Sequence, residues 1–193
     1  MSCAYLAFTE RGLALSQQLA AACPGPVARC GAGGPGLDEW TAAQFAASDA
    51  LIYIGAVGIA VRAIAPHCRS KAADPAVVVL DECGRFAVPL LSGHLGGANA
   101  LARRLAAVCG AVPVITTATD LHGLFAVDEW AKRQGCIVAE PERIKQVSGA
   151  LLAGKRVHFT ADWPIQGTPP AGVQPAAGGC ADFALTLTPT GQA

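Results

Sequence analysis

The chain has 193 residues, in which fourteen Lys and Arg residues balance fourteen Asp and Glu residues, and charged residues amount to 15%. This neutrality excludes a dedicated binder of nucleic acid or of an acidic membrane surface, because neither polyanion would find a surplus of positive charge. Hydrophobic residues make up 52% but aromatic residues only 6%. The core must therefore be built mainly from Val, Ile and Leu, with Ala and Gly allowing close packing.

Cysteine spacing argues against a zinc site. None of the eight cysteines forms a Cys-x-x-Cys pair, and no His stands at finger spacing from two of them. We expect most of them to be buried, reduced thiols that act as small apolar residues. No apolar stretch approaches the ~20 residues of a membrane-spanning helix, and no leader-like pattern precedes the first strand-like run. These features predict a soluble cytoplasmic protein.

Strand-like and helix-like runs alternate from the amino terminus, which is typical of parallel β-α-β units. In chain order we expect strands at 3–9, around Val27, 50–55, 76–80, 85–91 and 112–116, and helices at 12–23, 37–47, 58–65, 98–109 and 125–134. Residues 81–84 are typical of a hairpin turn, which leaves an antiparallel excursion open there. The pattern predicts an α/β fold, a mostly parallel open sheet with helices on both faces in a three-layer, Rossmann-like arrangement.

A smaller α/β unit is expected to follow. Strand-like residues 137–139 and 156–159 flank a helix that starts at Pro141 and runs to about Leu152, and residues 183–187 make a last strand. Between 164 and 179, eight of sixteen residues are Pro or Gly, which predicts a loop. We therefore expect an N-terminal domain at 1–135 and a central region at 136–193.

Three glycine-rich or polar segments each follow a predicted strand. Because ligands of open parallel sheets bind outside the carboxyl ends of the strands, we expect all three to line one crevice. In the first segment, residues 55–62 (GAVGIAVR), Gly55 and Gly58 would let the backbone approach a ligand and Arg62 would bind a carboxylate. A plain strand-to-helix turn with Arg62 on the surface explains the same residues.

The second segment, residues 91–99 (LSGHLGGAN), holds His94 between glycines just before the clearest helix. The helix dipole lowers imidazole basicity, which favours a neutral His94 able to accept a proton near neutral pH. The alternative is that Ser92 or His94 only caps the helix. The Gly-x-Ser-x-Gly order of a nucleophile elbow is absent.

The third segment carries Thr116, Thr117, Thr119 and Asp120. These side chains either bind polar substituents of a ligand or form local Asx and Ser/Thr turns. Four further charged residues lie in predicted loops, where solvated charge is the simpler interpretation for each: Lys71, Asp74, Asp81 and Glu82.

Taken together, four segments in this order resemble the CbiG family of anaerobic cobalamin biosynthesis. They are residues 55–62 (GAVGIAVR), 71–77 (KAADPAV), 90–99 (LLSGHLGGAN) and 114–120 (VITTATD). The part of the chain that follows them, up to Leu187, resembles the less distinctive central region of that family.

The resemblance implies a cobalt-precorrin-5A hydrolase, which opens the δ-lactone on ring A of a cobalt-containing tetrapyrrole and releases acetaldehyde. Cobalt then belongs to the substrate, and no cofactor or bound metal of the protein's own is expected. Under this hypothesis His94 is the catalytic base, and Asp81 or Asp120 orients its imidazole. Backbone N–H groups around Gly96 and Gly97 would hold the oxyanion.

The same hypothesis assigns the binding of the substrate. Arg62 and Lys71 would bind its peripheral carboxylates. The other residues expected to line the substrate site are Gly55, Gly58, Ser92, Gly93, Gly96, Gly97, Asn99, Thr116, Thr117 and Thr119.

Length leaves a second hypothesis open. Members of the family typically continue into a C-terminal domain, whereas this chain stops at Ala193, so either that domain is a separate polypeptide or the chain is truncated or less active. The alternative function is a non-catalytic tetrapyrrole-binding module that acts with a separate C-terminal-domain protein, and a homo-oligomer remains open. A nucleotide-binding domain is disfavoured because Gly-x-Gly-x-x-Gly is absent.

Overall fold

The computed structural model describes residues 1–31, 33–70, 73–178 and 180–186. The chain divides into two compact units, Met1–Ile115 and Thr116–Ala193, and each is described by itself. This division lies twenty residues before the domain boundary expected from the sequence, after residue 135. The difference concerns helix α6 (Val127–Arg133), which packs with α7 (Ile144–Leu152) in the second unit.

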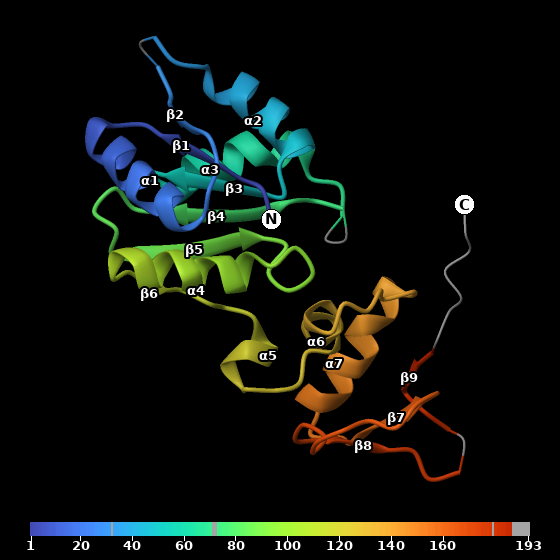
Figure 1. The fold of residues 1–193 in the computed structure, drawn as a ribbon. Coiled ribbons are helices and arrows are strands. Elements are labelled where there is room, and N and C mark those ends of the chain that lie inside the picture. The colour runs from blue at the N-terminus through green and yellow to red at the C-terminus, as the bar shows by residue number, and fades with distance from the viewer. Residues whose placement is uncertain (32, 71–72, 179, 187–193) are drawn as a thin grey trace. The chain divides into compact units, whose positions relative to one another are not determined.

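A six-stranded sheet forms the centre of the first unit, with the strand order β2-β1-β3-β4-β5-β6 (Figure 1). Its strands are β1 (Cys3–Ala7), β2 (Val27–Arg29), β3 (Ala50–Ile54), β4 (Ala76–Leu80), β5 (Phe86–Leu91) and β6 (Val112–Pro113). Every neighbouring pair is parallel except β4 and β5, which are antiparallel. The predicted α/β fold with a mostly parallel sheet is confirmed.

Helices cover both faces of this sheet. They are α1 (Glu10–Ala22), α2 (Leu37–Ala47), α3 (Val57–Ile64) with the 3-10 turn η1 (Ala65–His67), and α4 (Ala98–Cys109). Leu19 of α1 and Leu101 of α4 pack on one face, whereas Trp40 of α2 and Ile64 of α3 pack on the other. All residues of β1, β3 and β4 are buried, because a central strand that is covered on both faces reads as an unbroken apolar run.

The antiparallel hairpin of β4 and β5 decides where the loops of the first unit lie. Leu80 pairs with Ala87 and Val77 pairs with Leu91. The end of β5 therefore lies beside the start of β4, at the edge of the sheet opposite to the carboxyl ends of β1, β3 and β4. Figure 1 shows the loop after β5 at the far end of the sheet from the β4-to-β5 turn.

The second unit combines short helices with a three-stranded parallel sheet of order β8-β7-β9. Its elements are α5 (Ala118–Leu121), α6, the 3-10 turn η2 (Pro141–Arg143), α7, β7 (Val157–Ala161), β8 (Val173–Pro175) and β9 (Phe183–Leu185). A small core of Val147, Leu151, Val157 and Val173 lies between α7 and the sheet.

Two expectations about the second unit are wrong. Residues 137–139 form no strand, and the Ile137 side chain is 94% exposed, so this apolar residue has no neighbouring strand to cover it. Conversely, β8 forms inside the segment expected to be a loop, because Val157 of β7 pairs with Val173 and both are buried in the core. In the first unit, the strand expected at 112–116 ends early, at Pro113. Leu187, the last residue of the strand expected at 183–187, lies outside the described residues.

The expectation that most cysteines are buried is also wrong. All eight are free thiols, but only Cys3 and Cys23 are buried. Cys68, Cys83 and Cys180 are exposed, because they lie in turns and loops rather than in the elements that face the core. Within the described ranges, no helix is long and apolar enough to cross a membrane.

Candidate functional site

The first predicted segment lies at the carboxyl edge of the sheet. The Gly55 backbone N–H donates to the carbonyl of Leu80 at 2.8 Å, and the ring of Phe8 packs where a Cβ on Gly55 would be, 2.5 Å away. Gly58 and Arg62 lie on α3, and the exposed Arg62 side chain donates back to the Gly58 carbonyl at 3.2 Å. This segment therefore has a sufficient structural explanation as a tight strand-to-helix turn.

Asp81 lies at the same edge, in the turn between β4 and β5. Its carboxylate accepts hydrogen bonds from the backbone N–H groups of Cys83, Arg85 and Phe86 at 2.8–3.0 Å, and Arg85 forms an ion pair with it at 3.5 Å. Partial burial raises the pKa of Asp81, but these hydrogen bonds and the Arg85 charge outweigh it and hold the pKa below its ordinary value. Asp81 therefore shapes the hairpin turn.

The second predicted segment lies at the opposite, amino edge. Five residues of β4 separate the edges, roughly 16 Å at about 3.3 Å per residue. Asp81 is thus too far away to orient His94, and the expectation that the segments after β3 and β5 line one crevice is wrong. The physical reason is the reversal of β5, which moves its carboxyl end to the other side of the sheet.

The loop between β5 and α4, residues 92–97, is held in a defined conformation. Ser92 is buried and has a backbone φ of 56°, a left-handed value that no other non-glycine residue of the described chain shares. Its hydroxyl donates to the Asp74 carbonyl at 2.9 Å. Such strain in an L-residue persists only where the surroundings impose it, and it clusters at functional sites.

Glycines allow the loop to close on itself. A Cβ on Gly96 would lie 2.3 Å from the Ser92 Cβ, and a Cβ on Gly93 would lie 2.9 Å from the Asn99 side chain. Asn99, in the first turn of α4, is buried. These contacts give Ser92, Gly93, Gly96 and Asn99 a shared role in fixing the backbone on which His94 stands.

His94 itself is half-buried at the middle of this loop. Its carbonyl accepts the N–H of Gly97 at 2.9 Å, while the N–H groups of Ala98 and Asn99 donate to the carbonyls of Ser92 and Gly93. Gly97 is the N-cap of α4. Because the loop already uses the Gly97 N–H, that group is not available for an oxyanion, and Gly96 is the remaining glycine of the predicted pair.

Asp74 joins this loop to a neighbouring pocket. Its buried carboxylate accepts the Arg69 backbone N–H at 3.0 Å on both oxygens. It also lines a pocket of about 400 Å³, together with Ala42, Phe45, Ala46, Pro66, His67, Arg69 and Ala73. Asp74 thus lines the pocket and also contacts the His94 loop through Ser92. The pocket contains one imidazole, that of His67, and one guanidinium, that of Arg69.

Sequence reasoning missed this pocket. Asp74 was expected to be a solvated charge, but only 7% of it is exposed. His67 and Arg69 lie in and just after η1, which the sequence analysis does not predict. The hairpin turn at 81–84 was a signal for the contact between Asp74 and Ser92, because a hairpin places the residues before its first strand beside those after its second. Lys71, expected to bind a carboxylate, lies outside the described residues.

The third predicted segment opens the second unit. Thr117 is the N-cap of α5, its hydroxyl donates to the Asp120 carboxylate, and Thr119 is buried. Thr116 lies between β6 and α5. These contacts match the local-turn alternative, and the proposed role of Asp120 in orienting His94 stays a prediction. In the described part of the chain, no group of His, Cys, Asp and Glu side chains is arranged to hold a metal ion.

Comparison with known families gives two matches, consecutive along the chain. Residues 39–120 match the family described as "Cobalamin synthesis G N-terminal", and residues 125–176 match "Cobalamin biosynthesis central region". The two matches cover more than two thirds of the chain, and the first includes the His94 loop, Asp74 and the whole pocket beside them.

Individual relatives agree with this assignment. The chain is 49% identical over 114 residues to the cobalt-precorrin-5A hydrolase of Salmonella typhimurium, which covers 58% of the chain and 32% of the relative. It is 45% identical over 102 residues to the enzyme of the same name from Priestia megaterium, covering 53% of the chain and 27% of the relative. The matched segments thus span about a third or less of these curated relatives.

A solved structure shares the fold. The crystal structure of a cobalamin biosynthesis protein G homolog from Sulfolobus solfataricus superposes with a TM-score of 0.55 at 23% identity, over 89% of this chain and 52% of that one. With its N-terminal and central regions matched in order, the chain belongs to the CbiG family of cobalamin biosynthesis proteins.

Proposed function

We propose that this chain carries the catalytic base of a cobalt-precorrin-5A hydrolase, and that the base is His94. The observation that carries the proposal is the construction of the loop around His94. A left-handed Ser92, a Gly96 that leaves no room for a Cβ and a buried Asn99 fix its backbone. The names of the two bacterial relatives supply the reaction.

The reaction needs a base at two steps. Water adds to the lactone carbonyl as the base takes its proton, and collapse of the tetrahedral oxyanion breaks the ring C–O bond to give a carboxylate and a free hydroxyl. Deprotonation of that hydroxyl then breaks the adjacent carbon–carbon bond, releasing acetaldehyde and leaving the electron pair on the macrocycle, which takes up a proton. A neutral imidazole at position 94 can accept the first proton, return it and accept the second.

The neighbouring pocket supplies hydrogen-bond donors for the substrate's carboxylates. We assign this role to Arg69 and His67 in place of Arg62, because both line the pocket that reaches the His94 loop through Asp74. Arg62 lies on α3 and folds back toward the carboxyl edge of the sheet. A guanidinium binds a carboxylate through two parallel hydrogen bonds, so Arg69 would hold the substrate in register with His94.

The decisive experiment measures acetaldehyde release from cobalt-precorrin-5A under anaerobic conditions. We expect His94→Asn to abolish release while substrate still binds, and His158→Gln, a matched change on β7 in the second unit, to keep it. Arg69→Gln should raise KM with little change in kcat, whereas Arg62→Gln should leave both unchanged. If acetaldehyde release persists in His94→Asn, His94 is not the catalytic base.

A second candidate function is a non-catalytic tetrapyrrole-binding module that acts with a C-terminal-domain protein. The matched segments cover only 32% and 27% of the two bacterial hydrolases. The same assay separates the two functions. A binding module shifts the absorbance of the corrinoid but releases no acetaldehyde, even when the remaining part of the bacterial relative is added as a second polypeptide.

A further inference from the structure

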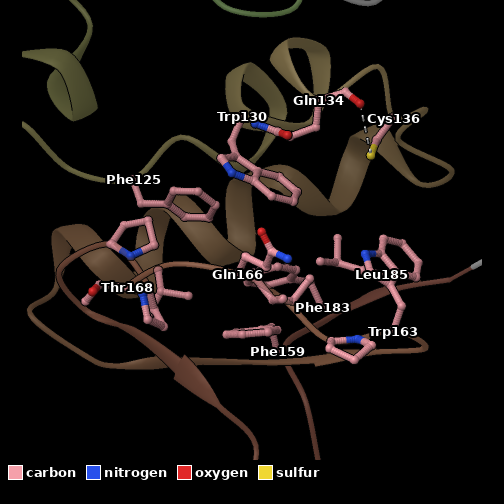
Figure 2. A pocket seen from close by; sticks show the side chains of 15 residues that line it. Phe125, Trp130, Gln134, Cys136, Phe159, Trp163, Gln166, Thr168, Phe183 and Leu185 are labelled. Carbon is pink, nitrogen blue, oxygen red and sulfur yellow. Dashed lines mark hydrogen bonds between the residues drawn. The ribbon is translucent and has the colours of Figure 1, made fainter.

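The second unit contains a pocket that has no part in the proposed hydrolysis. Its volume is about 520 Å³, which falls within the roughly 300–1,000 Å³ range of small-molecule sites. Five of the chain's eleven aromatic residues line it, namely Phe125, Trp130, Phe159, Trp163 and Phe183. Figure 2 shows their side chains gathered around one space.

Three of these rings form a row. Phe125 and Phe183 are 6.1 Å apart between ring centroids at an interplanar angle of 26°, and Phe159 and Phe183 are 6.0 Å apart at 24°. Trp130 of α6 adjoins the row at 6.2 Å from Phe125 and an angle of 59°. These near-parallel rings stack on one another, and such a stack favours a flat, conjugated ligand that extends it.

The aliphatic core of the unit does not require these aromatic side chains to be exposed around an open space. The buried cluster is aliphatic, and Phe125, Phe159 and Phe183 pack against it on one side. None of the five aromatic side chains is fully buried. Apolar rings that stay partly exposed around a concave space are typical of a binding site, because their remaining surface is covered only when a ligand binds.

The polar groups of the pocket are neutral. Gln134, Gln166 and Thr168 line it, and no Asp, Glu, Lys, Arg or His does so among the described residues. Amide N–H and hydroxyl groups donate hydrogen bonds to carboxylates. Aromatic rings with these donors therefore suit a large conjugated ring with acidic groups at its periphery.

We propose that this pocket binds a carboxylate-bearing tetrapyrrole macrocycle by stacking on the aromatic row. The choice of the macrocycle rests on the proposed function, whereas the pocket and its chemistry come from the second unit alone. Trp163 and Gln166 belong to the segment between β7 and β8, so they can be changed without entering the aliphatic core.

The probe is cobyrinic acid, a cobalt corrinoid with free carboxylates, titrated into the whole chain while its affinity is measured by calorimetry. Trp163→Leu should raise Kd about tenfold, the loss of one good stacking contact. Gln166→Glu should also raise Kd, because it places a negative charge beside the ligand's carboxylates. Trp40→Phe is the matched control, since Trp40 is buried against Tyr53 in the first unit, and its Kd should stay within twofold of the wild type.

A competitor distinguishes a stacking site from a general apolar surface. Coproporphyrin, a flat tetrapyrrole with four carboxylates, should displace cobyrinic acid, whereas a linear fatty acid should not. Displacement by the fatty acid, or a Kd within twofold of wild type in both pocket variants, overturns the proposal. The hydrolase proposal can fail independently of this one. If the pocket variants weaken binding but no acetaldehyde is released, the hydrolase proposal is wrong and the pocket proposal stands. If acetaldehyde release depends on His94 but the pocket variants leave Kd unchanged, the pocket proposal is wrong and the hydrolase proposal stands.

Discussion

The Ser92 hydroxyl donates a 2.9 Å hydrogen bond to the backbone carbonyl of Asp74, and both residues are buried. This bond connects the loop that carries His94 to the segment that enters β4, eighteen residues earlier in the chain. Asp74 in turn lines the pocket that holds His67 and Arg69. One side chain therefore couples the proposed base to the proposed substrate-binding groups.

Two substitutions at Ser92 separate its hydrogen bond from its backbone conformation. Ser92→Ala removes the donor and keeps a Cβ at a left-handed φ, so we expect the free energy of unfolding to fall by about 1–2 kcal/mol. Ser92→Gly removes the same donor but relieves the strain, so it should cost less. Urea denaturation followed by circular dichroism measures both, and a larger loss in Ser92→Gly would contradict the assignment of strain.

A methyl group at Gly96 tests how tightly the loop closes. The added Cβ would lie 2.3 Å from the Ser92 Cβ and 2.8 Å from its carbonyl oxygen, so the backbone must move. We expect Gly96→Ala to lower the free energy of unfolding by about 1–3 kcal/mol. Gly149→Ala is the control, because Gly149 lies in α7 and a new Cβ there would have no atom within 4 Å apart from its own helix backbone and chain neighbours; this change should be neutral or raise stability by up to about 1 kcal/mol. Equal effects of the two changes would show that the loop is loose.

The sequence predicted the layers of the first unit well, because buried strands such as 50–54 and 76–80 read as unbroken apolar runs and the helix at 98–109 has a clear apolar face. The second unit was harder. Its strands β8 and β9 are three residues each, too short to show a period, and β8 depends on its pairing with β7 rather than on its own composition.

The candidate site was only half predictable. The His94 loop was found because glycines and a histidine before a helix are visible locally. Its partner Asp74 was missed because the relation is not local: it depends on the direction of β5. The turn at Asp81 is visible in the sequence, but the positions of Arg62 and His94 at opposite edges of the sheet follow from the antiparallel pairing of β5 with β4.

A buried hydroxyl pair under α2 offers a test of the packing behind the pocket. The hydroxyls of Thr41 and Tyr53 lie 2.9 Å apart and both residues are fully buried. Thr41→Val and Tyr53→Phe each leave one buried polar partner without its hydrogen bond, so each should cost about 1–2 kcal/mol. The double variant should cost less than the sum of the two, because no orphaned group remains. Strict additivity in chemical denaturation would mean that the two hydroxyls do not stabilise each other.

Asp81 predicts a dependence of stability on pH. Burial raises its pKa, but hydrogen bonds from Phe86, Cys83 and Arg85 and the charge of Arg85 lower it further, so that the folded pKa lies below its ordinary value of 3.8. A carboxyl group with a lowered folded pKa stabilises the fold fully above its unfolded pKa, and this contribution is lost as the pH falls through the folded value. Asp81→Asn should therefore be less stable than the wild type at pH 7, and the difference should shrink as the pH falls below 3.8. Glu142→Gln is the control, because Glu142 is exposed in η2, and its stability should match the wild type at both pH values. A stability difference for Asp81→Asn that does not change with pH in urea denaturation would show that the charge of the carboxylate plays no part in the turn.

Acetaldehyde release at pH 7, measured on folded Asp81→Asn, should equal that of the wild type, because Asp81 and His94 lie at opposite edges of the sheet.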